Sequence, residues 1–270
     1  MPAGRFLTDD LARPLALEPV ARRVVSLAPS CTESLLAIGA HEHLVGIEEH
    51  SELPAALQAI PRVGGFKHVD FARVASLAPD LIVAASLHAV ETVPRLAAYG
   101  ARIFVSQPRT VDAIVSGMAR LAALLGLARE AAPIVDVARR RIDGVLARTL
   151  RGGMRPLVYV EFSPRGHTGG PQSFLDDLVT KAGGVNLGGA ARVEWPVIPG
   201  GVVQRLDPDM IVIAEYPGSA TPTSLAQRDG WERLSAVKAG RVFTLPAGTI
   251  KRPGPGVIDG LEHLATLLAR

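Results

Sequence analysis

The chain has one cysteine and no long apolar run. Cys31 stands alone among 270 residues, which excludes an internal disulfide and a zinc site built from cysteine pairs. No run approaches the ~18 consecutive apolar residues of a membrane-spanning helix. The N-terminal stretch MPAGRFLTDDLARPLALEP lacks the apolar core of about 7–15 residues that a secretory signal needs. We therefore expect no membrane span, and no export signal is visible.

Catalytic signatures are missing as well. The sequence contains no G-x-S-x-G elbow, no G-x-x-x-x-G-K-[ST] phosphate loop and no H-E-x-x-H pair. The stretch GGFKHVD lacks the third glycine and the strand–loop–helix placement of a phosphate loop. Cys31 has no Cys/His/Asn signature beside it, so we interpret it as a small buried side chain. We predict that the protein is not an enzyme, with neither catalytic residues nor a catalytic cofactor.

Charge is balanced and dispersed along the chain. Lys and Arg number 29 against 26 Asp and Glu, and the basic residues form no continuous stripe. Nucleic acid is therefore a poor candidate partner. The local run Arg139-Arg140-Arg141 lies in a segment of helical periodicity, and we interpret it as a solvated helix face.

One short element occurs twice, about 130 residues apart. LAPDLIVAA (77–85) and LDPDMIVIAE (206–215) share the pattern Leu-x-Pro-Asp followed by β-branched residues. Each copy follows one strand signal and precedes another, in the same order: RVVSLAP and GARIFVSQP in the first half, PLVYVEFSP and AGRVFTLPAG in the second. We interpret the element as structural. The Leu packs the end of a helix, the Pro stops that helix, and the Asp makes the turn into a strand.

Helix signals follow the first strand of each half. Ser30 with Glu33 resembles a capping box, and Ser173 with Asp176 occupies the same positions in the second half. Between the halves, residues 110–150 have apolar residues at three- and four-residue spacing, which predicts helix rather than a flexible linker. We place Pro133 in the first turn of the second helix there, where its missing N–H costs nothing.

Continuously apolar strands separated by helix-length segments predict an α/β fold with parallel sheets covered on both faces. We expect two α/β lobes with mainly parallel sheets, joined by a long rigid helix, with a ligand cleft between them. The predicted divisions are an N-terminal lead-in hairpin (1–22), an N-terminal lobe (23–110), a helical connector (111–152) and a C-terminal lobe (153–270).

Polar, glycine-rich loops follow the strands, and ligands of open parallel sheets bind beyond those strand ends. These loops contain four histidines: His50, His68, His88 and His167. Imidazole is a metal ligand, but lone loop histidines are more often solvated or hydrogen-bonded. We expect His41, His43 and His263 to be plain surface residues.

Several stretches together resemble one family. RVVSLAPSCTESLLAIGA, LVGIEEHSELP, IPRVGGFKHVDFARVASLAPDLIVAA, SFLDDLVTKAGGVNL and RPGPGVIDGLEHLATLL look like the substrate-binding proteins of ABC transporters for vitamin B12 and iron chelates. The resemblance runs from about Arg22 to the C-terminus and is strongest to the cobalamin-binding branch. It implies two lobes bridged by a backbone helix, a large chelate held between them, and a transporter permease as partner.

The resemblance also implies site residues, carried over position by position. Those of the first lobe are Pro29, Ser30, His50, Phe66, Lys67, Ser86, Leu87 and His88. Those of the second lobe are His167, Thr168, Trp195, Glu215, Tyr216 and Arg252. Glu91 matches an acidic residue that docks on the transporter. Lys67, Arg165 and Arg252 are candidates to pair with ligand carboxylates or phosphates, and His50, His88 and His167 are candidate axial or direct metal ligands.

Departures from the family pattern keep alternatives open. Phe66, Ala85 and Thr249 stand where the cobalamin binder has tryptophan, and Gly201 stands where a second docking glutamate is expected. The leading hypothesis is a monomeric, non-catalytic binder of cobalamin or a related metal chelate. The alternatives are a ferric siderophore or haem binder, a direct Zn or Mn binder, and an intracellular enzyme or sensor of the same fold. The resemblance implies a periplasmic location, whereas the lack of a visible signal leaves a cytoplasmic one open.

Overall fold

The computed structural model describes residues 5–149 and 153–269. The parts of the predicted lead-in and connector at residues 1–4 and 150–152 lie outside the described residues. The chain divides into two compact units. Unit 1 holds the residues up to Pro108 together with Ala113–Ala138, and unit 2 holds Arg109–Asp112 and the residues from Arg139 onward. The predicted lobe boundaries stay a prediction.

Unit 1 is built on a parallel sheet of four strands, in the order β4-β3-β7-β8. Its strands are β3 (Val24–Ser26), β4 (Leu44–Ile47), β7 (Leu81–Ala85) and β8 (Arg102–Ser106). Two hairpins accompany it, β1 (Phe6–Thr8) with β2 (Pro14–Ala16) and β5 (Gly64–Gly65) with β6 (His68–Val69). The helices are α1 (Pro29–Ala37), α2 (Phe71–Ser76), α3 (Thr92–Ala97), α4 (Val111–Leu124) and the first half of α5 (Ala128–Thr149), with short 3-10 turns at Ala40–His43, Ala55–Leu57 and Ser86–His88.

Unit 2 repeats this sheet with strands in the corresponding order, β10-β9-β11-β12, all parallel. Its strands are β9 (Leu157–Glu161), β10 (Val185–Asn186), β11 (Met210–Glu215) and β12 (Val242–Pro246). Its helices are α6 (Phe174–Lys181), α7 (Gly200–Leu206), α8 (Pro222–Ala226), α9 (Ser235–Lys238), α10 (Ala247–Ile250) and α11 (Val257–Leu268), with 3-10 turns at Leu187–Ala190 and Trp231–Arg233. The predicted α/β class with parallel sheets is confirmed.

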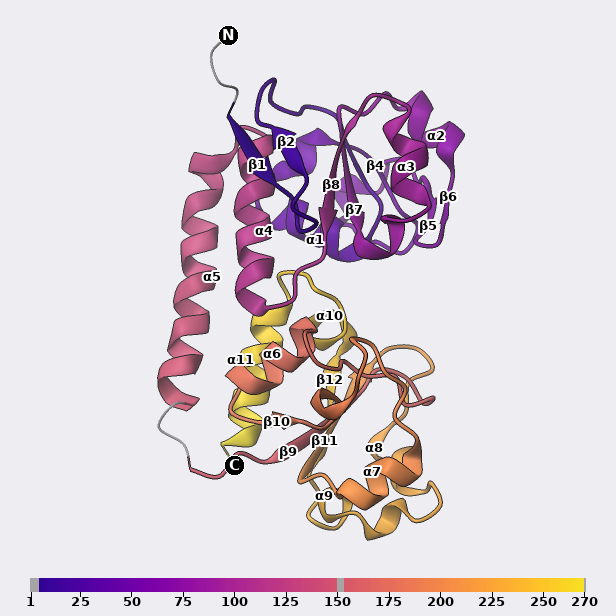
Figure 1. Ribbon diagram of the computed structural model, residues 1–270, viewed down its shortest axis with the longest axis vertical. Helices are drawn as coiled ribbons and strands as arrows, with labels where there is room; N and C mark the ends of the chain where they lie inside the picture. The colour runs from indigo at the N-terminus through magenta and orange to yellow at the C-terminus, as the bar shows by residue number, and fades with distance from the viewer. Residues whose placement is uncertain (1–4, 150–152, 270) are drawn as a thin grey trace. The chain divides into compact units, whose positions relative to one another are not determined.

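Apolar layers cover both faces of the sheet in unit 1. Val24 and Val83 face a core that includes residues of α1 and α4, whereas Val25 and Ile82 face a core that includes residues of α2 and α3. In Figure 1, α4 runs along one side of this sheet, and α2 and α3 lie on the other. Because successive strand residues point to opposite faces, a strand covered on both sides must be apolar throughout.

The repeated Leu-x-Pro-Asp element joins neighbouring strands. Asp80 accepts hydrogen bonds from the backbone N–H groups of Arg22 and Arg23, at 2.8 and 3.0 Å, just before β3. Asp209 likewise accepts from the N–H of Leu157, the first residue of β9, at 2.7 Å. The aspartate therefore does more than make the predicted turn, because its carboxylate holds the start of the adjacent strand.

The residue before the proline takes a left-handed conformation in both copies. Ala78 has φ 44° and Asp207 has φ 42°, so neither helix can continue into the strand. Leu77 packs in the core as predicted, but the corresponding prediction for Leu206 is wrong because its side chain is 46% exposed. The break in the helix therefore depends on the backbone at Ala78 and Asp207 rather than on the leucine.

One helix prediction is confirmed and two need correction. Ser173 caps α6 as expected, because its side chain accepts a hydrogen bond from the N–H of Asp176. Helix α1 begins at Pro29 and not after Ser30, because the fixed φ of proline suits the first turn and its missing N–H is not needed there. Pro133 is not in a first turn, because α5 already begins at Ala128 and the long helix tolerates one lost backbone bond.

The prediction that His43 lies on the surface is wrong. Its side chain is buried in the turn Ala40–His43, and neither ring nitrogen has a hydrogen-bond partner within the described residues. Burial lowers the pKa of His43 below its usual 6.5, and the charge of Arg22 lowers it further. The neutral imidazole is thus the form that suits the folded state.

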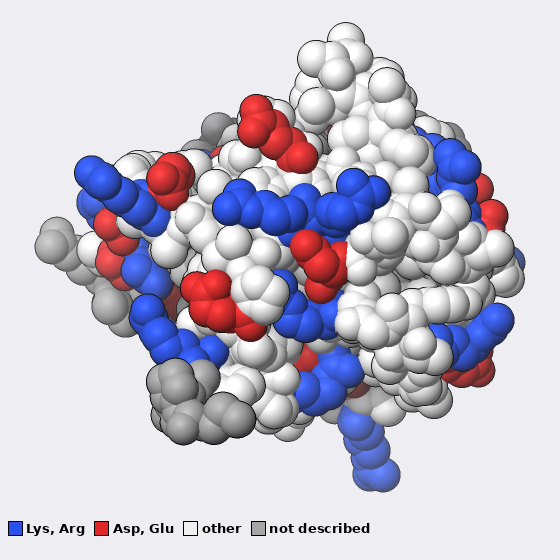
Figure 2. Space-filling model, turned by 90° about the horizontal axis from the view of Figure 1, so that it is seen from above, with Lys and Arg blue, Asp and Glu red and all other residues white. Residues whose placement is uncertain are grey.

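The charged surface is mixed. On the face in Figure 2, Lys and Arg side chains lie beside Asp and Glu. Among the described helices, none is long and apolar enough to cross a membrane.

We expect Asp80→Ala to lower the free energy of unfolding by about 1–2 kcal/mol, and Asp209→Ala to lower it by less. Asp80 accepts two backbone hydrogen bonds whereas Asp209 accepts one. Urea denaturation at pH 7 measures both. Asp229→Ala removes an exposed carboxylate as a control, and equal losses in all three variants would contradict the role of the repeated aspartate.

The stability of the fold should also fall as the pH is lowered below about 6.5. The unfolded chain then binds a proton at His43 that the folded chain takes up only at lower pH, because the pKa of the buried ring is depressed. Urea denaturation at pH 7.5 and pH 5 measures this loss. His43→Leu should reduce it while His41→Leu, at an exposed neighbour, should leave it intact; an unchanged loss in His43→Leu would disprove the assignment.

Candidate functional site

A pocket of about 570 Å³ opens at the carboxyl ends of the strands of unit 2. Its walls come from the loop after β9, from Trp195, from Tyr216 directly after β11, and from Lys251 directly after α10. Carboxyl ends of parallel strands meet at one sheet edge, which is where such folds bind ligands. The lining residues are Phe162, Ser163, Pro164, Arg165, His167, Thr168, Trp195, Tyr216 and Lys251.

The loop after β9 is a tight turn. The N–H of Phe162 donates to the carbonyl of His167 at 2.7 Å, and Ser163 Oγ pairs with His167 Nδ1 at 2.7 Å. Gly166, at φ 83°, makes the turn, and a Cβ there would lie 2.4 Å from the carbonyl oxygen of Ile198. Only glycine fits this close approach, so the turn presents His167 in one fixed place.

Aromatic rings form much of the pocket wall. The Trp195 ring is 6.2 Å from Phe162 and 5.8 Å from Phe174, centroid to centroid, yet 47% of Trp195 stays exposed. Lys251 Nζ lies 3.8 Å from the centroid of the Tyr216 ring, which is a cation–π contact. The wall therefore offers aromatic surface and a positive charge side by side.

The polar groups of the pocket differ in whether they have hydrogen-bond partners within the protein. The N–H of Thr168 donates to the carbonyl of Pro196 at 3.0 Å, but its buried hydroxyl has no hydrogen-bond partner among the described residues. The pKa of Lys251 is lowered by burial and then by the charge of Arg252. Both groups would gain from a ligand that accepts hydrogen bonds.

A buried ion pair supports the pocket loop from β9. Glu161, the last residue of that strand, is 1% exposed, and both its carboxylate oxygens accept from Arg228 at 2.6 and 2.8 Å. The Arg228 guanidinium also lies 4.7 Å from the centroid of the Trp231 ring. The pair joins the end of β9 to the loop after α8 and fixes the start of the turn at Phe162.

In unit 1, His88 organises the loops at the strand ends. Its Nδ1 accepts from the N–H of Ala85 at 3.1 Å, so its Nε2 donates to the carbonyl of Phe66, at 2.7 Å. The two rings also meet edge to face, with centroids 5.3 Å apart. Burial lowers the pKa of His88, which favours the neutral ring that this pattern requires. His88 thereby ties the loop after β7 to the β5–β6 hairpin.

This geometry corrects one metal prediction. Both nitrogens of His88 are occupied, so it has no lone pair for a metal ion, because the neutral ring has one acceptor nitrogen and Ala85 uses it. His50 is exposed, and His167 uses Nδ1 for Ser163. Within the described residues, no cluster of three or more His, Cys, Asp or Glu side chains could hold a metal ion.

Cys31 is buried as predicted. Burial raises the pKa of its thiol to about 12, so it carries no thiolate near neutral pH. The neighbouring Ser30 is also buried, and its carbonyl accepts from Ser34 Oγ at 2.8 Å. The start of α1 is therefore packed rather than reactive.

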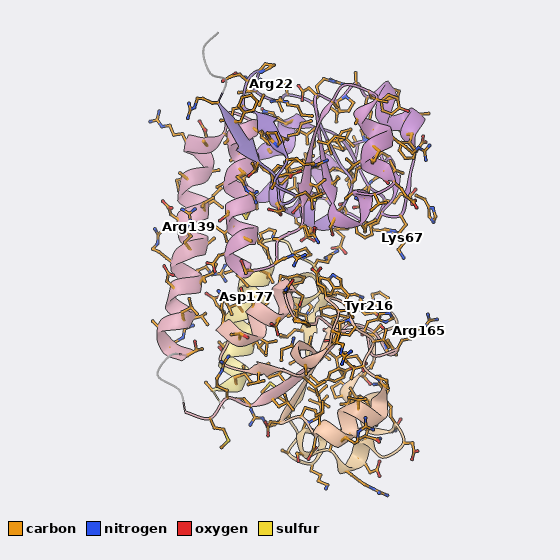
Figure 3. The ribbon with its side chains drawn as sticks, in the orientation of Figure 1. Arg22, Lys67, Arg139, Arg165, Asp177 and Tyr216 are labelled. Carbon is orange, nitrogen blue, oxygen red and sulfur yellow. The ribbon has the colours of Figure 1, made fainter. Side chains whose placement is uncertain are left out.

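The remaining predicted residues lie on loops or at helix ends. In unit 1, Pro29 begins α1, exposed Lys67 lies between β5 and β6, Ser86 and exposed Leu87 precede His88, and exposed Glu91 precedes α3. In unit 2, exposed Glu215 ends β11 and lines a neighbouring pocket with Tyr216, and Arg252 follows Lys251. Figure 3 labels Lys67 in unit 1, and Arg165 and Tyr216 in unit 2.

The structure brings five of the predicted residues into the pocket of unit 2: Arg165, His167, Thr168, Trp195 and Tyr216. It also places there Phe162 and Lys251, which were not among the predicted ligand contacts. Glu161 was missed too, although a lone acid at the end of the apolar run VYVE is a sequence signal for a paired, buried carboxylate. Nothing in the sequence indicated that Lys251, rather than the adjacent Arg252, would line the pocket.

Comparison with known proteins identifies the family. Residues 24–249 match the family model described as periplasmic binding protein. The chain belongs to the periplasmic binding protein family. This confirms the resemblance drawn from the strand and loop stretches at the level of the family.

Individual relatives are more distant. The uncharacterized ABC transporter substrate-binding lipoprotein YvrC of Bacillus subtilis is 25% identical over 252 residues, which cover 90% of this chain and 79% of that protein. A vitamin B12-binding protein of Yersinia pestis is 28% identical over 230 residues, 79% of each chain. The solved periplasmic vitamin B12-binding protein of Vibrio cholerae superposes with a TM-score of 0.81 at 24% identity, covering 92% of this chain and 97% of its own. This structural match confirms the two-lobed fold.

We expect Arg228→Met to lower the free energy of unfolding by about 2–4 kcal/mol, because it leaves the buried carboxylate of Glu161 without its cation. The double variant Glu161→Leu with Arg228→Met should recover most of this loss. Urea denaturation of the two variants and the wild type measures both effects. A double variant as unstable as the single one would show that the ion pair is not the source of the loss.

Proposed function

We propose that this protein is a non-catalytic binding protein that holds a corrinoid of the vitamin B12 class, or a related planar metal chelate, for an ABC importer. The observation that carries the proposal is the aromatic wall of the pocket in unit 2, formed by the exposed Trp195, the half-buried Tyr216 and the buried Phe162. Aromatic surface with a few fixed polar groups suits a large, flat and mostly apolar ligand. Relatives named for vitamin B12 binding support the same class.

The chemistry of the described residues supports binding rather than catalysis. Among the described residues, the contact between Ser163 and His167 resembles a nucleophile and its base, but the two residues lie only four positions apart in one turn. Among the described residues no carboxylate contacts His167, so the third group that orients such a base has no counterpart. Cys31 is buried with a raised pKa. A protein that only holds its ligand needs none of these groups.

Delivery to a membrane transporter and a location outside the cytoplasm belong to the same proposal. Both are supported by membership of the family and by a relative named as an ABC transporter substrate-binding lipoprotein. Glu91 is exposed just before α3 and is the residue that we propose for docking on the transporter. At the position expected for a second docking acid, Gly201 in α7 provides no carboxylate.

Thermal unfolding with added cobalamin, haem, a ferric siderophore, Zn²⁺ or Mn²⁺ tests the ligand class. We expect cobalamin or another macrocyclic chelate to raise the midpoint temperature and the free metal ions to leave it unchanged. Stabilisation by Zn²⁺ or Mn²⁺ alone would contradict the proposal.

Trp195→Ala should weaken binding of the stabilising chelate about tenfold in isothermal titration calorimetry, because stacking on an exposed aromatic ring is lost. Trp231→Phe, at the other tryptophan, which is buried, serves as the control and should change the affinity less than twofold. Equal affinities of wild type and Trp195→Ala would remove the pocket of unit 2 from the binding site.

A further inference from the structure

The pocket of unit 2 has positive charge that its own residues do not neutralise. Arg165 and Lys251 both line it, and neither forms an ion pair with a carboxylate of the described residues. Glu215 lines the neighbouring pocket and is not part of this lining. In Figure 3 the Arg165 side chain extends away from the body of its unit. The pocket therefore combines an exposed cation, Arg165, with Lys251, which is fixed by its contact with an aromatic ring.

Lys251 is the fixed cation. Its ammonium group lies over the Tyr216 ring at 3.8 Å, and its side chain is half-buried. Burial and the adjacent Arg252 both lower its pKa, which means that the charged form is held without full compensation. An anion beside Nζ would offset this cost, whereas a second apolar contact would add to it.

Thr168 provides an independent observation. It is 1% exposed, and its hydroxyl has no hydrogen-bond partner among the described residues even though its residue lines the pocket. The backbone N–H of Thr168 is used by its bond to Pro196, which leaves the hydroxyl as the unpaired donor of this residue. A buried unpaired hydroxyl is unfavourable, and a ligand oxygen would satisfy it.

We propose that this pocket receives an oxyanion arm of the bound chelate, either a carboxylate or a phosphate. Lys251 and Arg165 neutralise its charge, and Thr168 donates a hydrogen bond to one of its oxygens. The aromatic wall around Trp195 contacts the apolar body from which the arm extends. The inference rests on the proposed function and adds to it that acid-bearing chelates bind more tightly than their neutral counterparts.

Matched pairs of probes distinguish the contribution of the acidic arm to binding from that of the macrocycle. Cobalamin carries a phosphodiester in its nucleotide arm, which cobinamide lacks, and haem carries two carboxylates, which its dimethyl ester masks. Isothermal titration calorimetry should show at least tenfold tighter binding of the acid-bearing member of the pair that fits, with the preference shrinking at high salt. A preference within the corrinoid pair that Lys251→Met abolishes assigns a phosphate, and one within the porphyrin pair that the same variant abolishes assigns a carboxylate.

Three variants test the residues. Lys251→Met should weaken binding of the acid-bearing probe about tenfold, change the neutral probe less than twofold, and be rescued by Lys251→Arg. Thr168→Val should weaken the same probe without lowering the thermal midpoint, because it removes an unpaired hydroxyl and keeps the shape of the side chain. Lys238→Met removes an exposed charge from α9 and should change neither probe.

The outcomes distinguish the two proposals. Equal affinities of acid and neutral probes, or an equal weakening of both by Lys251→Met, would overturn the oxyanion site while leaving chelate binding intact. Binding of none of the four probes would overturn the proposed function, and the oxyanion site with it.

Discussion

The aspartate of the repeated Leu-x-Pro-Asp element determines how each unit begins its sheet. Asp80 and Asp209 both accept backbone N–H bonds from the start of the neighbouring strand, and each donates its own N–H to a carbonyl there, at 3.0 and 2.9 Å. These reciprocal bonds fix which residues of β7 and β3, and of β11 and β9, lie side by side. With the register fixed at one end, the loops at the other end of the strands come to lie at a single edge.

The pocket of unit 2 depends on that register. Ile213 of β11 pairs with Glu161 of β9, so Phe162 follows β9 about two residues before the level at which Tyr216 follows β11. A shift of one residue would turn Glu161 and its ion pair with Arg228 to the opposite face of the sheet. The same shift would move the turn that presents His167. The aspartate at one end of the sheet thus contributes to the site at the other, although it touches no ligand.

The strands were predictable because their signals are local. A buried parallel strand must be apolar at every position, and a helix that meets Leu-x-Pro-Asp must stop, so β7 and β11 follow from the residues themselves. The burial and the hydrogen-bond partners of His88, His43 and Thr168 could not be predicted in this way. Whether an imidazole uses both nitrogens, or a hydroxyl has no partner, depends on residues far away in sequence, as Phe66 is from His88. The chemistry of the site is therefore a property of packing, while the fold is largely a property of local pattern.

Hydrogen bonding separates the residues that support the loops from the residues that we propose for binding. Glu161, Arg228 and His88 make hydrogen bonds to protein groups, and these bonds hold loops in place and occupy the bonded atoms. Thr168 and Lys251, in contrast, line a pocket with their polar capacity unused by the described residues. An unpaired buried hydroxyl lowers the stability of the folded chain, and a hydrogen bond from a ligand would offset that loss. In the binding mode that we propose, the incomplete groups, more than the aromatic ones, specify which arm of a chelate the pocket accepts.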